Sequence, residues 1–177
     1  MSYKTGKLIT SQRLRRNLGE LLFFESDPAV GFGIDKKNVL TGLNTVHSTE
    51  ADKLVVPASF FNTTNYADKA AAEAAFISAF VGINLTHPEL GKREKVPVAQ
   101  ECDVEFACTA AKYVAGEMLT WVWDATNEWV DPMKFAKTTD ISKAIAYVVE
   151  TAPIAPVTGN VTRITGRIKR LSFVPSS

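Results

Sequence analysis

The chain of 177 residues has few of the residue types that most often build metal and catalytic sites. It contains only two histidines and two cysteines, and neither histidine stands at a spacing typical of metal ligands. Cys102 and Cys108 lie on one predicted strand, which would separate them by about 20 Å, whereas a disulfide needs Cα atoms within about 7 Å. We therefore expect two reduced, packed thiols and neither a disulfide nor a zinc site.

Long apolar runs and an excess of one charge are also missing. No run approaches the length that spans a bilayer, and residues 1–16 hold no apolar core of signal-peptide length. The 20 basic and 19 acidic side chains give a formal net charge of +1. Proteins that bind nucleic acid usually carry a basic domain or stripe. We expect a soluble protein that the general export route does not secrete, with no nucleic-acid or membrane partner.

The motifs of common enzyme classes are not found either. There is no phosphate loop, nucleophile elbow or His-Glu-x-x-His helix, and the glycines of segment 31–33 lack the third glycine of a dinucleotide site. We expect no enzymatic activity, no cofactor and no metal. An enzyme remains the alternative hypothesis, because Asp103 and Glu105 share one face of a predicted strand. These carboxylates would have to meet His47 or His87 in a cleft.

Residues 1–25 are predicted to form an extended arm followed by a short helix. Residues 10–24 place four leucines near helical spacing, and Thr10 or Ser11 can cap the helix. Its other side carries three arginines, which are Arg13, Arg15 and Arg16. Such a cluster is either a solvated face or a contact with an acidic neighbour, so it is a candidate partner-contact site.

Residues 26–95 are predicted to form an α/β region. As far as residue 66, short apolar pieces stand between Gly, Asn, Asp and Pro. This pattern indicates irregular structure with one or two short strands. The charged, turn-rich segment 86–95 is the candidate domain boundary.

An Ala-rich helix over about 66–81 is the strongest element of this region. Alanine is the best helix former, Thr64 or Asn65 can cap the start, and Gly82 can end the helix. The small side chains would let the helix lie close to a sheet. The segment VGINL predicts a strand directly after it.

Residues 96–177 are predicted to form a C-terminal antiparallel β-domain. Val104, Phe106 and Cys108 alternate with polar or small residues, and Gly and Pro separate five or six such segments. The prediction for the whole chain is an α+β fold that is mostly β. It combines a small antiparallel β-barrel or sandwich at the C-terminus with an N-terminal arm and one or two helices.

All three tryptophans of the chain, Trp121, Trp123 and Trp129, lie within residues 115–131. Strand parity places the first two on one side of a strand, and the third begins the next strand. The rings are candidate contact residues with three possible places: inside the barrel, at a subunit interface, or exposed. If they are exposed together, the alternative function is a carbohydrate-binding module.

Arg163 and Arg167 share strand parity near the C-terminus and predict a basic stripe. Gly166 between them indicates a possible bulge. Nucleic-acid binding would interleave aromatic side chains with the basic ones, and here they are scarce. We therefore expect the stripe to face solvent or an acidic edge of another subunit, which makes both arginines candidate partner contacts.

The segments of residues 96–171 follow a defined order of strands and turns. It runs through YVAGEMLTW, the connection VDPMKFAKTTD, the strand KAIAYVVE and the closing strand VTRITGRI. This order resembles the small β-domain of tailed-bacteriophage head decoration proteins, also called structural cement proteins. In that family, Ala144, Ile145 and Ala146 would correspond to the step where the chain re-enters the barrel.

The resemblance implies a non-enzymatic virion protein on the outer surface of a tailed-phage capsid, made in the cytoplasm of the host. The implied partners are the major capsid protein and further copies of the chain, as a homotrimer. Such a protein bridges neighbouring capsid subunits. The arm of residues 1–20 would then add backbone hydrogen bonds or a helix to a neighbour.

Overall fold

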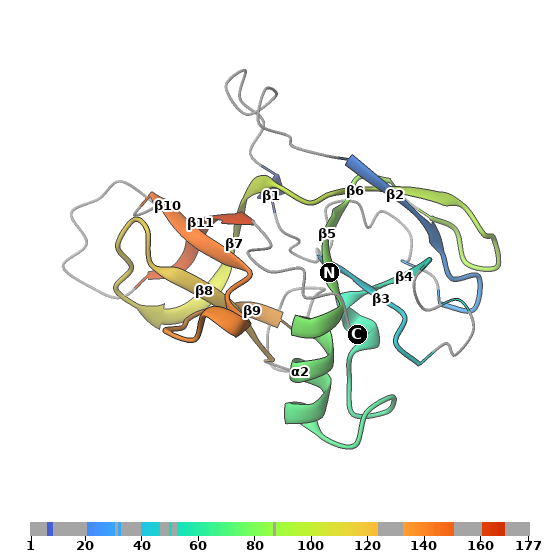
Figure 1. The fold of residues 1–177 in the computed structure, drawn as a ribbon, viewed down its shortest axis with the longest axis horizontal. Coiled ribbons are helices and arrows are strands. Elements are labelled where there is room, and N and C mark those ends of the chain that lie inside the picture. The colour runs from blue at the N-terminus through green and yellow to red at the C-terminus, as the bar shows by residue number, and fades with distance from the viewer. Residues whose placement is uncertain are drawn as a thin grey trace.

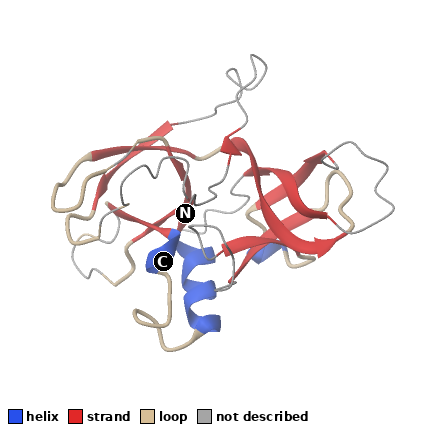
Figure 2. Cartoon of the chain, turned by 180° about the vertical axis from the view of Figure 1, so that it is seen from behind, coloured by secondary structure: helices blue, strands red, loops and turns tan. Residues whose placement is uncertain are grey.

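The structure is a computed structural model that describes residues 7–8, 21–30, 32, 40–46, 50, 53–86, 88–123, 133–150 and 161–168. The elements in chain order are β1 (Lys7–Leu8), β2 (Leu21–Ser26), β3 (Leu40–Leu43), β4 (Leu54–Pro57), η1 (Ala58–Phe60), α2 (Lys69–Ala79), β5 (Phe80–Asn84), β6 (Lys95–Ala99), β7 (Cys102–Ala111), β8 (Met118–Trp123), β9 (Met133–Lys137), η2 (Ile141–Lys143), β10 (Ala146–Glu150) and β11 (Val161–Ile168). Two groups of strands lie side by side (Figure 1), and Figure 2 shows α2 between them. In the described part of the chain, no helix is both long and apolar enough to cross a membrane.

Five strands of the N-terminal half close into a barrel in the order β2-β4-β3-β5-β6, on the right of Figure 1. β2 and β4 are parallel, and the other neighbours are antiparallel. Both β4 and β5 are buried along their whole length. A strand buried on both faces shows no alternation of polar and apolar residues. The one or two short strands predicted within residues 26–66 are present as β3 and β4, and the strand predicted after the helix is present as β5. Their closure into a barrel with β2 and β6 was not predicted.

The C-terminal strands form a second barrel in the order β7-β11-β10-β8-β9. It closes where β9 meets β7 in a parallel pair, with Cys108 opposite Phe135, whereas its other neighbours are antiparallel. β1 pairs with β7 and places Lys7 opposite Glu105. The predicted α+β, mostly β fold with a small C-terminal barrel is therefore confirmed, and the barrel before it is an addition.

The predicted helix within residues 10–24 is wrong at its C-terminal end. Residues 21–24 belong to strand β2, which pairs with β6 from Leu21 opposite Ala99 to Glu25 opposite Lys95. The sheet hydrogen bonds of the barrel outweigh the helical spacing of the leucines, because local propensity is a weak preference. The same pairing places β6 in the first barrel, although the predicted boundary assigned residues 96–99 to the C-terminal domain.

The predicted Ala-rich helix is present as α2, but its two ends differ from the prediction. The cap is Asp68, whose Oδ1 accepts a hydrogen bond from the Ala71 backbone at 2.8 Å. The helix stops before Phe80, the first residue of β5. Gly82 therefore lies inside a strand, at a φ of +140°, where a Cβ would come within 2.2 Å of the Ala99 carbonyl oxygen. Close approach of two strands requires this glycine.

Gly166 lies opposite Val104 of β7 and Val148 of β10. The register against β7 is regular at this point, whereas the register against β10 shifts between Val148 and Glu150, directly beside the Gly166 pair. A Cβ at position 166 would meet the Phe135 ring at 2.9 Å. This glycine makes room for an aromatic ring inside the barrel. The possible bulge that its position indicated corresponds to the register shift beside it, between β10 and β11.

Candidate functional site

Trp121 of β8 is completely buried in the core that joins the two barrels. Its indole stacks on Phe135 of the second barrel at 4.4 Å between ring centroids. The edge of Phe80, from β5 of the first barrel, approaches the same indole at 5.4 Å, and Phe76 of α2 lies at 6.1 Å. Of the three possible places for the rings, Trp121 takes the interior, so it cannot belong to an exposed sugar-binding platform.

Trp123 lies at the edge of the same core, half-buried beside α2. Its backbone N–H donates to Glu73 Oε2 at 3.0 Å, and the Lys69 ammonium lies 5.1 Å from its ring centroid. Helix α2 therefore binds the end of β8 through a charge-assisted hydrogen bond and a cation–π contact. Trp123 serves to dock the helix on the second barrel.

Arg167 and Arg163 on β11 face acidic side chains on the neighbouring strand β7. Arg167 donates from Nε and Nη2 to the two oxygens of Asp103, at 2.6 and 3.0 Å. Arg163 Nε lies 2.6 Å from Glu105 Oε1. The hydrogen bond with Asp103 raises the pKa of Arg167. The acidic edge expected from another subunit is thus supplied by the protein's own β7.

The same ion pairs involve both carboxylates that the enzyme hypothesis would use. Asp103 is buried and gripped by both nitrogens of the Arg167 fork, and Glu105 pairs with Arg163. Both carboxylates therefore balance charge between β7 and β11. Over the ranges that the structure covers, no group of three or more His, Cys, Asp or Glu side chains could hold a metal ion.

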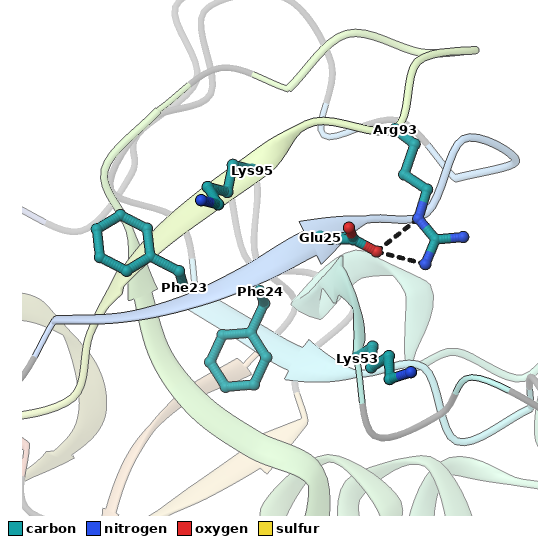
Figure 3. A pocket seen from close by; sticks show the side chains of 6 residues that line it. All are labelled: Phe23, Phe24, Glu25, Lys53, Arg93 and Lys95. Atoms are coloured by element: carbon teal, nitrogen blue, oxygen red, sulfur yellow. Dashed lines mark hydrogen bonds and ion pairs between the residues drawn. The ribbon is translucent and has the colours of Figure 1, made fainter.

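An open pocket of about 400 Å³ lies on the outside of the first barrel. Figure 3 shows its lining, which comes from β2, β6 and the residues just before β4 and β6. The six lining residues are Phe23, Phe24, Glu25, Lys53, Arg93 and Lys95. Phe23 is 62% exposed, so most of its ring faces solvent. The pocket combines this ring with three cationic side chains and one carboxylate.

Arg93 closes one end of the pocket by binding two carboxylates of the protein itself. It donates from Nη2 to Glu50 Oε1 at 2.9 Å and from Nε to Glu25 Oε2 at 2.5 Å. The hydrogen bond with Glu50 makes the largest contribution to raising the pKa of Arg93, and the hydrogen bond with Glu25 the next largest. The two lysines of the pocket, Lys53 and Lys95, form no ion pair with a described residue. The pocket therefore presents an excess of positive charge.

Sequence reasoning did not identify this pocket. Phe23 was assigned to a helix, and Lys95 to a linker some seventy residues away in the sequence. Only the pairing of β2 with β6 brings them together, with the Lys95 ammonium 5.7 Å from the Phe23 ring centroid. The repeated aromatic in LLFFES was the available indication of a strand, since aromatic residues favour strands.

Several predicted contact residues lie outside the described residues. They are Arg13, Arg15, Arg16 and Trp129, together with the two histidines, His47 and His87. The contact of the N-terminal arm with a partner therefore stays a prediction.

Comparison with known proteins identifies no relative, because the chain matches no protein-family model, no curated protein and no solved structure.

Proposed function

We propose that this protein is a non-enzymatic structural protein of a tailed-bacteriophage virion. In this proposal it binds the outer surface of the capsid, as a homotrimer, and stabilises contacts between major capsid subunits. Residues 96–171, which resemble head decoration proteins, include all five strands of the second barrel.

The observation that carries the proposal is the aromatic core shared by the two barrels. A protein that clamps neighbouring capsid subunits has to transmit force between its own halves. Interfaces within a chain allow relative motion unless they are large and apolar. The contact of Trp121 with Phe80 on one side and Phe135 on the other removes that freedom. Two barrels that share one core form the kind of rigid body that a clamp requires.

The entry into β10 gives further support. Ala144, Ile145 and Ala146 are all buried, and β10 begins at the last of them. The Ile145 backbone N–H donates to the Leu119 carbonyl at 2.9 Å. Here the chain leaves η2 and returns to the barrel, and the resemblance to decoration proteins implies such a step at these residues.

Capsids purified from a phage mutant that lacks the protein provide the test. The purified protein is expected to form a trimer in light scattering, to cofractionate saturably with these capsids and to raise the temperature at which they break open. The same protein unfolded in urea and diluted into the assay is the control for nonspecific adsorption. A monodisperse monomer without affinity for the capsids would contradict the proposal.

A further inference from the structure

We propose that the pocket lined by residues of β2 and β6 and by Lys53 binds an extended, acidic segment of a partner protein, which adds as a strand along the edge of β2 that faces β4. The inference deepens the proposed function and rests on it only in taking the major capsid protein as that partner. The chemistry of the segment follows from the pocket itself. Three features carry it: a strand edge that no described strand pairs, an exposed aromatic ring, and two lysines that form no ion pair with a described carboxylate.

The first feature is the edge of β2. Along one edge β2 pairs with β6 over residues 21–25, but along the other it pairs with β4 only at Glu25 and Ser26. No described strand pairs with that second edge at residues 21–24. An unpaired edge offers backbone donors and acceptors that an extended segment can satisfy. The open stretch lies directly beside the pocket, which Phe23 and Phe24 line.

The second feature is apolar surface at the same place. Phe23 is 62% exposed and its sequence neighbour Leu22 is 37% exposed. Single exposed apolar side chains are common on protein surfaces. Here, however, two adjacent ones stand on the unpaired edge of a strand, and one of them lines a pocket. The two side chains point to opposite faces of β2, and an incoming segment with an apolar side chain on the pocket side would remove the Phe23 ring from water, which favours its binding.

The third feature is the charge of the pocket. Arg93 is occupied by Glu25 and Glu50, whereas Lys53 and Lys95 form no ion pair with a described residue. Lys95 already lies over the Phe23 ring, so a strand that covers this ring passes close to its ammonium group. A carboxylate on that strand would be attracted to the lysines, and a basic side chain would be repelled. This charge selects an acidic segment over a basic or neutral one.

A random peptide library displayed on yeast, panned against the full-length protein, tests this chemistry. The pocket variant carries Phe23→Ser, Lys53→Gln and Lys95→Gln, which removes the ring and both charges from exposed positions. The control variant carries Val114→Ser, Lys112→Gln and Lys143→Gln, equivalent exposed changes on the second barrel. We expect enriched peptides that alternate acidic with apolar residues. They should bind the wild type and the control equally, and the pocket variant at least about tenfold more weakly.

Hydrogen exchange then locates the bound peptide, and protection of amides in residues 21–24 is expected. Failure to enrich any peptide, enrichment of peptides without acidic residues, equal binding to the pocket variant, or protection confined to other strands would each overturn the inference.

Binding to the depleted capsids separates this inference from the proposed function. Peptides that bind as expected, together with capsids that do not bind the protein, would refute the proposed function and leave the acidic-strand site standing. Capsids that bind the wild type and the pocket variant equally would refute this site as the capsid contact and leave the proposed function standing.

Discussion

Trp121 of β8 stacks on Phe135 of β9, with ring centroids 4.4 Å apart and ring planes 11° from parallel. The stack continues into the other barrel, because the edge of Phe80 meets the same indole. Removing the Trp121 side chain would leave a cavity that borders both barrels, beside Phe135 in one and Phe80 in the other. Trp121 therefore contributes to the stability of both halves, within the core cluster that they share.

Replacing Trp121 with alanine is expected to lower the free energy of unfolding by about 3–5 kcal/mol, the usual cost of emptying a fully buried aromatic site. Urea unfolding followed by circular dichroism measures the loss. Trp123→Phe is the matched control and should cost less than about 1.5 kcal/mol, because its ring is only half-buried and an aromatic ring is kept. Equal losses in the two variants would show that Trp121 does not hold the barrels together.

The two arginine pairs of β11 should differ in strength. Asp103 has a side chain only 7% exposed, so Arg167→Met leaves a buried carboxylate unpaired and should cost about 2–3 kcal/mol, less than a fully buried pair because Arg167 is 32% exposed. Arg163→Met breaks a more exposed pair and should cost less than about 1 kcal/mol. Thermal unfolding measures the loss of stability in each of the two variants. A double-mutant cycle with Asp103→Asn should return a coupling energy, and additive losses would contradict the pairing.

The two buried thiols, of Cys102 and Cys108, should make folding stability fall at high pH. Burial raises the pKa of Cys102 to about 12 and that of Cys108 to about 11. In the unfolded chain both thiols titrate near pH 8.5 (about the ordinary value), so the folded state favours the protonated form. Their contribution is complete below about pH 8 and is lost as the pH rises through these folded values. The free energy of unfolding, measured by urea titration, should decline from about pH 9 upward.

A Cys102→Ala variant is the control for this decline, which should become shallower. At neutral pH neither thiol of the native protein should react with a thiol reagent, and both should react in urea. Rapid labelling of the native protein would contradict the buried position of the thiols.

Substitution of Gly166 tests the packing beneath it. A Cβ at this position would lie 2.9 Å from the Phe135 ring and 3.2 Å from Leu119, so Gly166→Ala forces a shift in the core and should cost about 1–3 kcal/mol. Gly116→Ala is not a neutral control, because its φ is +90°. Ala110→Gly, at an exposed position of β7, is a better comparison, with an expected loss of about 1 kcal/mol or less. An unchanged melting temperature for Gly166→Ala would contradict the close contact.

The elements found from the sequence are those with a local pattern. The alanines of residues 70–75 predicted α2, and the alternation of Val104, Phe106 and Cys108 predicted β7, because each pattern repeats within a few residues of itself. The ends of α2 were wrong, since Phe80 begins a strand whose partners, β3 and β6, lie far away in the sequence.

The candidate site could not be predicted from the sequence, because its residues come together only in the folded chain. Phe23, Lys53 and Lys95 line one pocket because β2 pairs with both β4 and β6, and no feature near any one of them in the sequence indicates the other two. Likewise, Asp103 and Arg167 were noted as separate acidic and basic features. Their ion pair follows only from the register of β7 against β11.

The sequence alone determined that this protein is mostly β, that it has an Ala-rich helix and a C-terminal barrel, and that its cysteines are too far apart along one strand to join. These properties depend on periodicity and on distances along the chain. Only the tertiary structure decided that a first barrel exists, that Trp121 is core, and that the basic stripe is neutralised from within. Strand pairing and burial join residues that are distant in sequence, and their energy depends on which partners meet.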